Sequence, residues 1–403
     1  MRLLVQKYGG TSLATTDRIV QVAERIARAH DDGVGVLVVV SAMGGTTDEL
    51  LGLASRISAR PPARELDMLL TTGERVSMAL LSMALHELGH AAVSYTGSQS
   101  GIITDTHHAD ARILEVRAAR LEESLAQGRV VIVAGFQGVS SEREVTTLGR
   151  GGSDTTAVAL AAALGAERCE ICTDVAGVCS ADPRRVPRAR TLHAITYDEM
   201  LELAAHGAQV LHPRCVEIAR RFNVRLEVRS SFEATKGTVI GAMERIETAV
   251  IRGIACDADV ATVTVHDVGA HDVATLFSTL GDARIATRLV VQTAEAETCN
   301  VVCLLRRDDA ARAREILTSP SALGARLRVE TDENVAALSI VGQGIQSHPG
   351  SVARVLSALR EADVRVRLVS SSSISLHCVV ERSQADHALN TLHTRLGLDA
   401  SEE

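Results

Sequence analysis

The strongest constraint on the fold is the alternation of short apolar runs with amphipathic segments over residues 1–240. The apolar runs predict strands at Leu3–Gln6, Val34–Val40, Val130–Ala134 and Glu170–Thr173, and apolar residues at helical spacing predict helices at Met68–Leu88 and Ala157–Leu164. Such alternation is typical of βαβ units, so we predict an α/β fold with a mostly parallel sheet sandwiched by helices. Ligands of such a sheet bind beyond the carboxyl ends of its strands.

The pattern changes after Gly237. Strands are predicted at Ala261–Val265, Asn300–Leu305, Val335–Val341, Val364–Val369 and Ser375–Val380, and helices at Val273–Leu280 and Pro349–Leu359. Two units of roughly seventy residues have a similar strand–helix–strand–strand–helix order, which indicates an internal repeat. We therefore predict two small α+β domains of the βαββαβ type in tandem, a common arrangement in ligand sensors.

Length and composition agree with this organisation. A chain of 403 residues predicts two or three domains. Only 2% of the residues are aromatic, so the cores must be built from Ala, Leu, Val and Ile, as in helix-covered parallel sheets. The net charge of -8 argues against a nucleic-acid partner. We find no signal segment and no apolar stretch that would span a membrane, and so we expect a soluble, cytoplasmic protein without a membrane partner.

Two patterns that suggest a metal site have simpler explanations. Cys169 and Cys172 form a C-x-x-C within an apolar run, with no second pair at zinc-finger spacing, so we interpret them as buried reduced thiols. His107 and His108 are adjacent, and adjacent histidines rarely both reach one ion. We therefore predict no metal site in the protein.

Lysine is nearly absent: forty of the 42 basic residues are arginine, and the two lysines are Lys7 and Lys236. Lys7 begins the segment Lys7–Ser12, which places a glycine pair and hydroxyls at a strand-to-helix junction. Glycines let the backbone approach an anion, and a helix N-terminus offers free N–H groups. A phosphate-handling lysine would be useful there, although the segment is not a Walker A loop.

Two further segments suggest the same chemistry. Thr146–Thr156 contains Arg150, which would clamp a carboxylate, and Asp154, which would order Lys7 or a metal-bound network. Alternatively, Asp154 caps a helix that starts near Thr155. Thr173–Gly177 and Ala181–Arg184 read either as a nucleotide-binding edge or as a loop with an Asx-turn.

Several motifs resemble those of the aspartate kinase family, in that family's order and spacing. They are Lys7–Ser12, Ser41–Gly44, Thr72–Glu74, Thr146–Asp154, Thr173–Asp174, Asp182–Arg184 and Val228–Phe232. The similarity covers essentially the whole chain, and the C-terminal half resembles a tandem ACT regulatory region. It implies an amino-acid kinase catalytic domain at 1–245 and ACT-like domains at 246–330 and 331–403.

The resemblance implies transfer of the γ-phosphate of Mg-ATP to L-aspartate, giving 4-phospho-L-aspartate, the entry to lysine, methionine and threonine synthesis. Lys7 would stabilise the transferring phosphoryl group and Asp154 would orient it. Aspartate would be held by Ser41, Thr47, Glu74, Arg150 and Ser153. ATP and the Mg²⁺ that it carries would be bound by Lys7, Gly9, Gly10, Thr173, Asp174, Cys179, Asp182, Arg184 and Gln209.

The chain departs from the family in its nucleotide loop. Cys172 and Cys179 stand at two tyrosine positions, and Ala176 replaces an aspartate. Cys172 either leaves the adenine without an aromatic neighbour or packs beneath the loop. Gln209 replaces a frequent lysine, and we expect weaker ATP binding because glutamine brings no charge.

The regulatory half departs more. The family's first effector loop is shortened to His266–Val273, and its S-T-S-E-I segment lacks the glutamate at Ser370–Ile374. Gln292, Ser347 and His348 remain at positions that contact effectors in relatives. We hypothesise that lysine and threonine inhibit weakly or not at all.

Two alternatives stay open. One is an amino-acid kinase of a specialised pathway that acts on another acidic amino acid or analogue, and the other is a non-catalytic amino-acid sensor. In either case, ACT-like domains usually pair their sheets across a subunit interface, so we expect a homo-oligomer.

Overall fold

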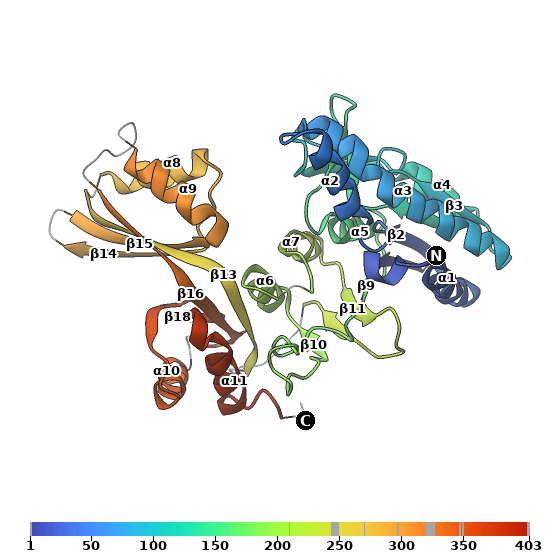
Figure 1. Cartoon of the computed structure of the whole chain (residues 1–403). Coiled ribbons are helices and arrows are strands. Elements are labelled where there is room, and N and C mark those ends of the chain that lie inside the picture. The colour runs from blue at the N-terminus through green and yellow to red at the C-terminus, as the bar shows by residue number, and fades with distance from the viewer. Residues whose placement is uncertain are drawn as a thin grey trace. The chain divides into compact units, whose positions relative to one another are not determined.

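The computed structural model describes residues 2–208, 210–242, 250–269, 271–295, 298–319, 327–345, 348 and 350–400. It divides the chain into two compact units (Figure 1). The first contains Met1–Val178, Thr191–Ala205 and Gln209–Glu244, and the second contains Cys179–Arg190, His206–Ala208 and Arg245–Glu403. No helix in the described part of the chain is long and apolar enough to cross a membrane.

The first unit is built on an eight-stranded sheet in the order β10-β12-β11-β9-β1-β2-β6-β3. The strands are β1 (Leu3–Tyr8), β2 (Gly35–Val40), β3 (Ala92–Tyr95), β6 (Val130–Ala134), β9 (Arg168–Thr173), β10 (Ala194–Ile195), β11 (Leu226–Ser230) and β12 (Thr238–Ile240). Neighbouring strands pair in parallel except β11 and β12, which are antiparallel. The predicted mostly parallel sheet is therefore confirmed. Its physical basis is that continuous Val/Ile/Leu runs suit strands buried on both faces.

Helices cover both faces of this sheet. The helices of this unit are α1 (Thr16–Asp31), α2 (Thr46–Ile57), α3 (Ala63–Glu87), α4 (Ala119–Ala126), α5 (Gly152–Ala163), α6 (Tyr197–Ala205) and α7 (Pro213–Phe222). Tyr8 packs with α1 and α3 in one apolar cluster. Side chains alternate along a strand, so Lys7 points to the opposite face, where α5 packs against β1.

A second, four-stranded sheet in the order β5-β4-β7-β8 was not predicted. Its strands are β4 (Ile102–Thr104), β5 (Ile113–Val116), β7 (Gln137–Ser140) and β8 (Val145–Thr147). β8 leads directly into the glycine-rich segment before α5, so this small sheet fixes where that segment begins.

The second unit has one six-stranded sheet in the order β14-β15-β13-β16-β18-β17. The strands are β13 (Val250–Gly269), β14 (Leu289–Glu295), β15 (Thr298–Arg306), β16 (Arg328–Gln343), β17 (Val366–Ser371) and β18 (Ser375–Glu381), and the α-helices are α8 (Val273–Asp282), α9 (Arg307–Thr318), α10 (Ser351–Glu361) and α11 (Ala385–Arg395). The predicted tandem α+β repeat is confirmed, although β14, α9 and α11 had not been predicted from the sequence.

The two repeats share their longest strands. β13 pairs with β16 from Val250 to His266. The early part of β13, with Ile254, packs against α10 and α11, whereas the later part, with Val263, packs against α8 and α9. Figure 1 shows these helix pairs at opposite ends of the β13–β16 pair. The predicted boundary between residues 330 and 331 therefore lies inside β16.

Candidate active site

The carboxyl ends of β1, β2 and β6 border a cavity of about 540 Å³ in the first unit. All the residues expected at the phosphoryl-transfer and aspartate sites line it, together with Gly10 of the expected nucleotide site: Lys7, Gly10, Ser41, Thr47, Glu74, Arg150, Ser153 and Asp154. They come from five separate segments of the chain. The parallel sheet is what brings these segments together, because its carboxyl ends meet at one edge.

Lys7 and Asp154 form the central ion pair. Lys7 Nζ lies 2.7 Å from Asp154 Oδ1, and the two side chains are only 13% and 11% exposed. The alternative in which Asp154 caps a helix near Thr155 is wrong. The helix α5 begins at Gly152, so Asp154 lies inside its first turn with its carboxylate turned to Lys7.

The start of α5 depends on Gly151. Its φ of 67° is left-handed, and a Cβ there would lie 2.2 Å from the Cβ of His212. Only glycine fits such a position without strain. The first turn of a helix leaves N–H groups without intrahelical partners, and Gly152, Ser153 and Asp154 line the cavity at this point. The cavity therefore has a ready anion-binding end beside the Lys7 ammonium.

Glu74 lies in α3 and is 3% exposed. Its Oε1 accepts a hydrogen bond of 3.2 Å from the N–H of Ala42, whereas its Oε2 is buried without a hydrogen-bond partner in the described part of the chain. Burial raises the pKa of Glu74 to about 7, although the Ala42 N–H partly opposes this. A buried carboxylate oxygen facing a cavity is suited to a cationic group of a ligand.

Arg150 is the exposed cation of the same cavity. No described residue forms an ion pair with it, so its guanidinium is available to a ligand carboxylate. Ser41 is held at the end of β2 by a hydrogen bond of 3.1 Å from its N–H to the carbonyl of Tyr8. Thr47 belongs to the first turn of α2.

Asp67 lies behind the cavity wall and is a positioning residue that the sequence reasoning missed. It is fully buried in α3, where its carboxylate accepts a 2.6 Å hydrogen bond from Thr147 Oγ1 and a 3.1 Å bond from the N–H of Ala109. His108 Nδ1 lies 2.7 Å from it. Since Ala109 and Thr147 both line the cavity, Asp67 fixes one of its walls. The sequence offered one signal for Asp67: it is an acidic residue on the apolar side of the helical pattern.

The edge expected to bind the nucleotide begins beside Lys7. The N–H of Gly9 donates a 3.4 Å hydrogen bond to the carbonyl of Cys172, which joins the end of β1 to β9. Thr173 follows, with its Oγ1 3.0 Å from Oδ1 of the exposed Asp174. Cys172 itself packs beside Tyr8 in the apolar cluster, and burial raises its pKa to about 11. Of the two interpretations of Cys172, the structure favours the one in which its side chain packs beneath the loop, because the thiol is buried in that cluster.

The remaining nucleotide candidates belong to the second unit or lie outside the described residues. Cys179, Asp182 and Arg184 belong to the second unit. There, Arg184 Nη2 lies 2.8 Å from Asp182 Oδ2, and hydrogen bonding to the guanidinium lowers the pKa of Asp182. Gln209 lies outside the described residues.

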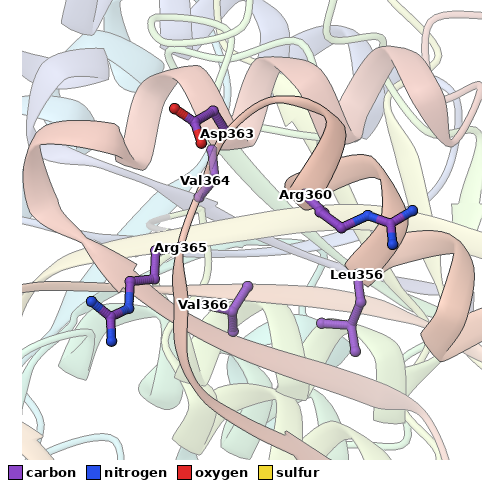
Figure 2. A pocket seen from close by; sticks show the side chains of 6 residues that line it. All are labelled: Leu356, Arg360, Asp363, Val364, Arg365 and Val366. Atoms are coloured by element: carbon purple, nitrogen blue, oxygen red, sulfur yellow. The ribbon is translucent and has the colours of Figure 1, made fainter.

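The expected effector positions are spread over the second unit. Gln292 is exposed on β14, and Ser347 lies outside the described residues. His348 precedes α10 and lines a cavity of about 590 Å³ together with Arg190 and Arg354. A smaller cavity of about 320 Å³ lies between α10 and β17 (Figure 2). Figure 2 shows its arginines, Arg360 and Arg365, pointing away from each other, so they do not form one anion site.

The cysteines and the adjacent histidines have separate partners. Cys169 and Cys172 are buried free thiols, as predicted. His107 faces Asp105, whereas His108 faces Asp67.

Comparison with known proteins gives one consistent picture. Residues 2–230 match the amino acid kinase family and residues 338–396 match an ACT domain. An aspartokinase of Bacillus sp. (strain MGA3) is 47% identical over 405 residues, covering 100% of this chain and 98% of that protein. The structure of E. coli aspartokinase III in complex with aspartate and ADP (R-state) has a TM-score of 0.85 at 26% identity and covers 98% of this chain and 100% of its own.

The same E. coli enzyme in complex with lysine and aspartate (T-state) has a TM-score of 0.76 at 26% identity, over 98% of this chain and 99% of its own. The resemblance seen in the motifs is confirmed by sequence and by fold. This chain therefore belongs to the amino acid kinase family and, within it, to the aspartokinases, which are ATP-dependent kinases.

Proposed function

We propose that this aspartokinase transfers the γ-phosphate of Mg-ATP to the β-carboxylate of L-aspartate, giving 4-phospho-L-aspartate and ADP. The observation that carries the proposal is the cavity that holds the Lys7–Asp154 ion pair together with Glu74 and Arg150. Arg150 and Glu74 supply charges opposite to the α-carboxylate and the α-ammonium of aspartate, and Lys7, held by Asp154, supplies the cation for the transferring phosphoryl group. The complex of E. coli aspartokinase III with aspartate and ADP supports this choice of ligands.

The acceptor amino acid would be held by opposite charges. Arg150 would pair with the α-carboxylate, and the partner-free Oε2 of Glu74 would face the α-ammonium. Ser41, Thr47 and Ser153 would donate hydrogen bonds that fix the orientation of the bound amino acid. The β-carboxylate is then left to point at the phosphoryl donor.

Phosphoryl transfer needs positioning and electrostatic stabilisation more than covalent chemistry. In the proposed step, a β-carboxylate oxygen forms a bond to the γ-phosphorus as the bond from the γ-phosphorus to the β,γ-bridging oxygen breaks. The electron pair of the broken bond stays on the bridging oxygen, which leaves as part of ADP. Lys7 and the N–H groups at the start of α5 would stabilise the charge on the transferring oxygens. Asp154 would hold the ammonium of Lys7 in place.

The nucleotide would lie along the edge formed by Gly9, Gly10, Thr173 and Asp174. By the family resemblance, Cys179, Asp182, Arg184 and Gln209 would complete the binding of Mg-ATP. Mg²⁺ binds through few protein carboxylates and through substrate phosphates, so it would enter as part of the substrate.

The proposal is tested by trapping the acyl phosphate as its hydroxamate with Mg-ATP and L-aspartate. Lys7→Ala should abolish hydroxamate formation. Lys236→Ala is the matched control, because the second lysine is exposed and does not line the cavity. If the native protein yields a hydroxamate with another acidic amino acid but not with aspartate, that amino acid replaces aspartate as the acceptor. A native protein without any such activity would overturn the proposal.

Regulation and assembly are part of the same proposal. The product would feed lysine, methionine and threonine synthesis, and lysine or threonine would bind the ACT region weakly. β14 and β17 are the edges of the second unit's sheet, and pairing such edges across two copies would give a homo-oligomer.

A further inference from the structure

Three chain connections meet at the edge of the large sheet opposite the candidate active site. The strands β2, β6 and β3 are neighbours and run parallel, so the residues just before them gather at one edge. His30 and Asp31 end α1 ahead of β2, His90 precedes β3, and Gly128 precedes β6. Lys7 and Asp154 lie at the other, carboxyl edge. This histidine cluster has no part in the chemistry proposed above.

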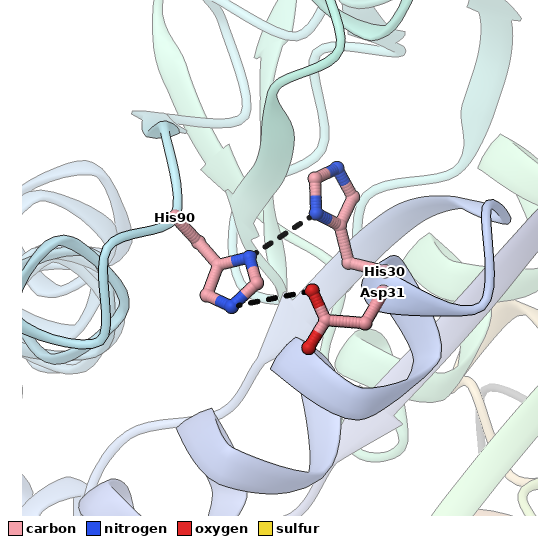
Figure 3. A group of neighbouring side chains, drawn as sticks. All are labelled: His30, Asp31 and His90. Atoms are coloured by element: carbon pink, nitrogen blue, oxygen red, sulfur yellow. Dashed lines mark hydrogen bonds and ion pairs between the residues drawn. The ribbon is translucent and has the colours of Figure 1, made fainter.

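The two imidazoles face each other through the same ring atom. His30 Nδ1 lies 3.2 Å from His90 Nδ1, and their rings are inclined at 79° (Figure 3). The other nitrogen of each ring faces an oxygen: His30 Nε2 lies 3.2 Å from the carbonyl oxygen of Gly128, within hydrogen-bond distance, and His90 Nε2 lies 3.8 Å from Asp31 Oδ1, within ion-pair distance. With the proton of His30 on Nε2, where the Gly128 carbonyl accepts it, the Nδ1 lone pair of His30 faces His90 Nδ1. When the proton of His90 lies on Nε2, beside the Asp31 carboxylate, both Nδ1 lone pairs are free to bind one ion.

This is the arrangement that histidine metal ligands adopt. A ligating histidine usually donates its other ring N–H to a backbone carbonyl or a carboxylate, which fixes the tautomer and the ring orientation. With zinc–nitrogen bonds of about 2.0–2.1 Å, two nitrogens of a tetrahedral site lie about 3.4 Å apart. The Nδ1–Nδ1 separation of 3.2 Å matches that spacing, and one ligand atom from each of His30, Asp31 and His90 lies within 4.8 Å of the other two.

We propose that His30 and His90 bind a divalent transition-metal ion of the kind that imidazole prefers, such as Zn²⁺, through their two Nδ1 atoms. Water completes the coordination, and Asp31 orients His90 from outside. Access is open because Asp31 is 68% exposed, whereas His90 is 14% exposed and so already held in place. The ion joins the end of α1 to the entry of β3, and its role is to stabilise the first unit.

The test is calorimetric titration of the full-length protein with Zn²⁺ alone. We expect a saturable site at one ion per chain. His30→Gln and His90→Gln should each weaken it at least tenfold, and Asp31→Asn should weaken it by about 10- to 100-fold, the usual effect of an outer partner. His107→Gln is the matched control, because it removes an exposed histidine and should leave this site unchanged.

Two further measurements keep the test decisive. Zn²⁺ should raise the melting temperature of the native chain but not that of the His30→Gln, His90→Gln double variant, since a ligand of the folded state stabilises it. Cu²⁺ bound to the native chain should show the electron paramagnetic resonance of two nitrogen ligands, which needs no variant at all. Equal Zn²⁺ affinity in the native chain and the double variant, or a native chain without saturable binding, would overturn the proposal.

Discussion

Lys7 Nζ and Asp154 Oδ1 lie 2.7 Å apart, and this ion pair joins the end of β1 to the first turn of α5. The two residues are 147 positions apart in sequence, and only the adjacency of β1 and α5 brings them together. Because the pair is largely shielded from water, each charge has a strong influence on the other. The pair thus sets the position of the ammonium that the proposed transfer requires.

Asp154→Asn should lower kcat by about 10²- to 10³-fold, the usual loss when one preorganised electrostatic group is removed, with a small change in KM for aspartate. The amide keeps the size of the side chain but no longer holds the Lys7 ammonium. The hydroxamate assay measures this split. Asp198→Asn, an exposed acid of α6, is the control, and an unchanged kcat in Asp154→Asn would show that the pair is only structural.

Glu74 should give aspartate binding a pH dependence. Its pKa of about 7, raised by burial, means that the carboxylate needed for the substrate ammonium disappears as the pH falls below 7. KM for aspartate should therefore rise on going from pH 8 to pH 6. Glu74→Gln should have a high KM at both pH values, and a native KM that does not change with pH would contradict the assigned role.

The same group should affect stability in the opposite sense. The folded pKa of Glu74 lies above its usual 4.5, so the folded state binds the proton more tightly and loses stability as the pH rises from 4.5 to about 7. The loss amounts to about 3 kcal/mol. Glu74→Gln should therefore be more stable than the native chain at pH 8, but not at pH 4.5, in urea unfolding without ligands. Glu65→Gln, an exposed acid of the same helix, should show no such difference.

Asp67→Ala should destabilise the first unit by about 3 kcal/mol, because it leaves the buried hydrogen-bond partners of this carboxylate without an acceptor. KM for aspartate should rise as well, since Ala109 and Thr147 lose the group that places them in the cavity wall. Asp105→Ala changes a more exposed acid of the neighbouring loop and serves as the control. Equal KM values in the two variants would limit Asp67 to a role in folding.

The sequence predicted the central strands well because strands buried on both faces are continuous apolar runs. β2 and β6 were placed to within one residue at each end. The four-stranded sheet escaped notice because its strands are three or four residues long, and because β7 and β8 contain Gln, Ser and Thr in place of a continuous apolar run. β13 was predicted too short because Asp257 and Asp259 interrupt its apolar pattern, at a point where its pairing with β16 is irregular.

The site residues that belong to sequence motifs were predicted, whereas a residue that reaches the site only through the fold was not. Lys7, Glu74, Arg150 and Asp154 stand in motifs, and the structure gathers them in one cavity. Asp67 acts through partners that lie 42 and 80 positions away, which no local pattern reveals. The expectation of no metal site was based on the C-x-x-C pair and the adjacent histidines and stays a prediction. The pair for which we propose a metal, His30 and His90, is 60 residues apart and meets only through the strand order.

The turn between β17 and β18 is where weak inhibition by lysine is best tested. The glutamate of the related S-T-S-E-I segment corresponds to Ser373, which is exposed, while Ser372 and Ser375 close the turn through a 2.7 Å hydrogen bond between their hydroxyls. A longer acidic side chain at Ser373 therefore fits without disturbing the turn. A hydrogen bond to a charged group is worth about 1.5–3 kcal/mol, so Ser373→Glu should lower the inhibition constant for lysine by about 10- to 100-fold. The control Ser370→Glu, on β17 itself, should leave it unchanged. A native chain that lysine already inhibits at micromolar concentration would contradict the proposal, because the missing carboxylate would then have no role in holding the effector's ammonium.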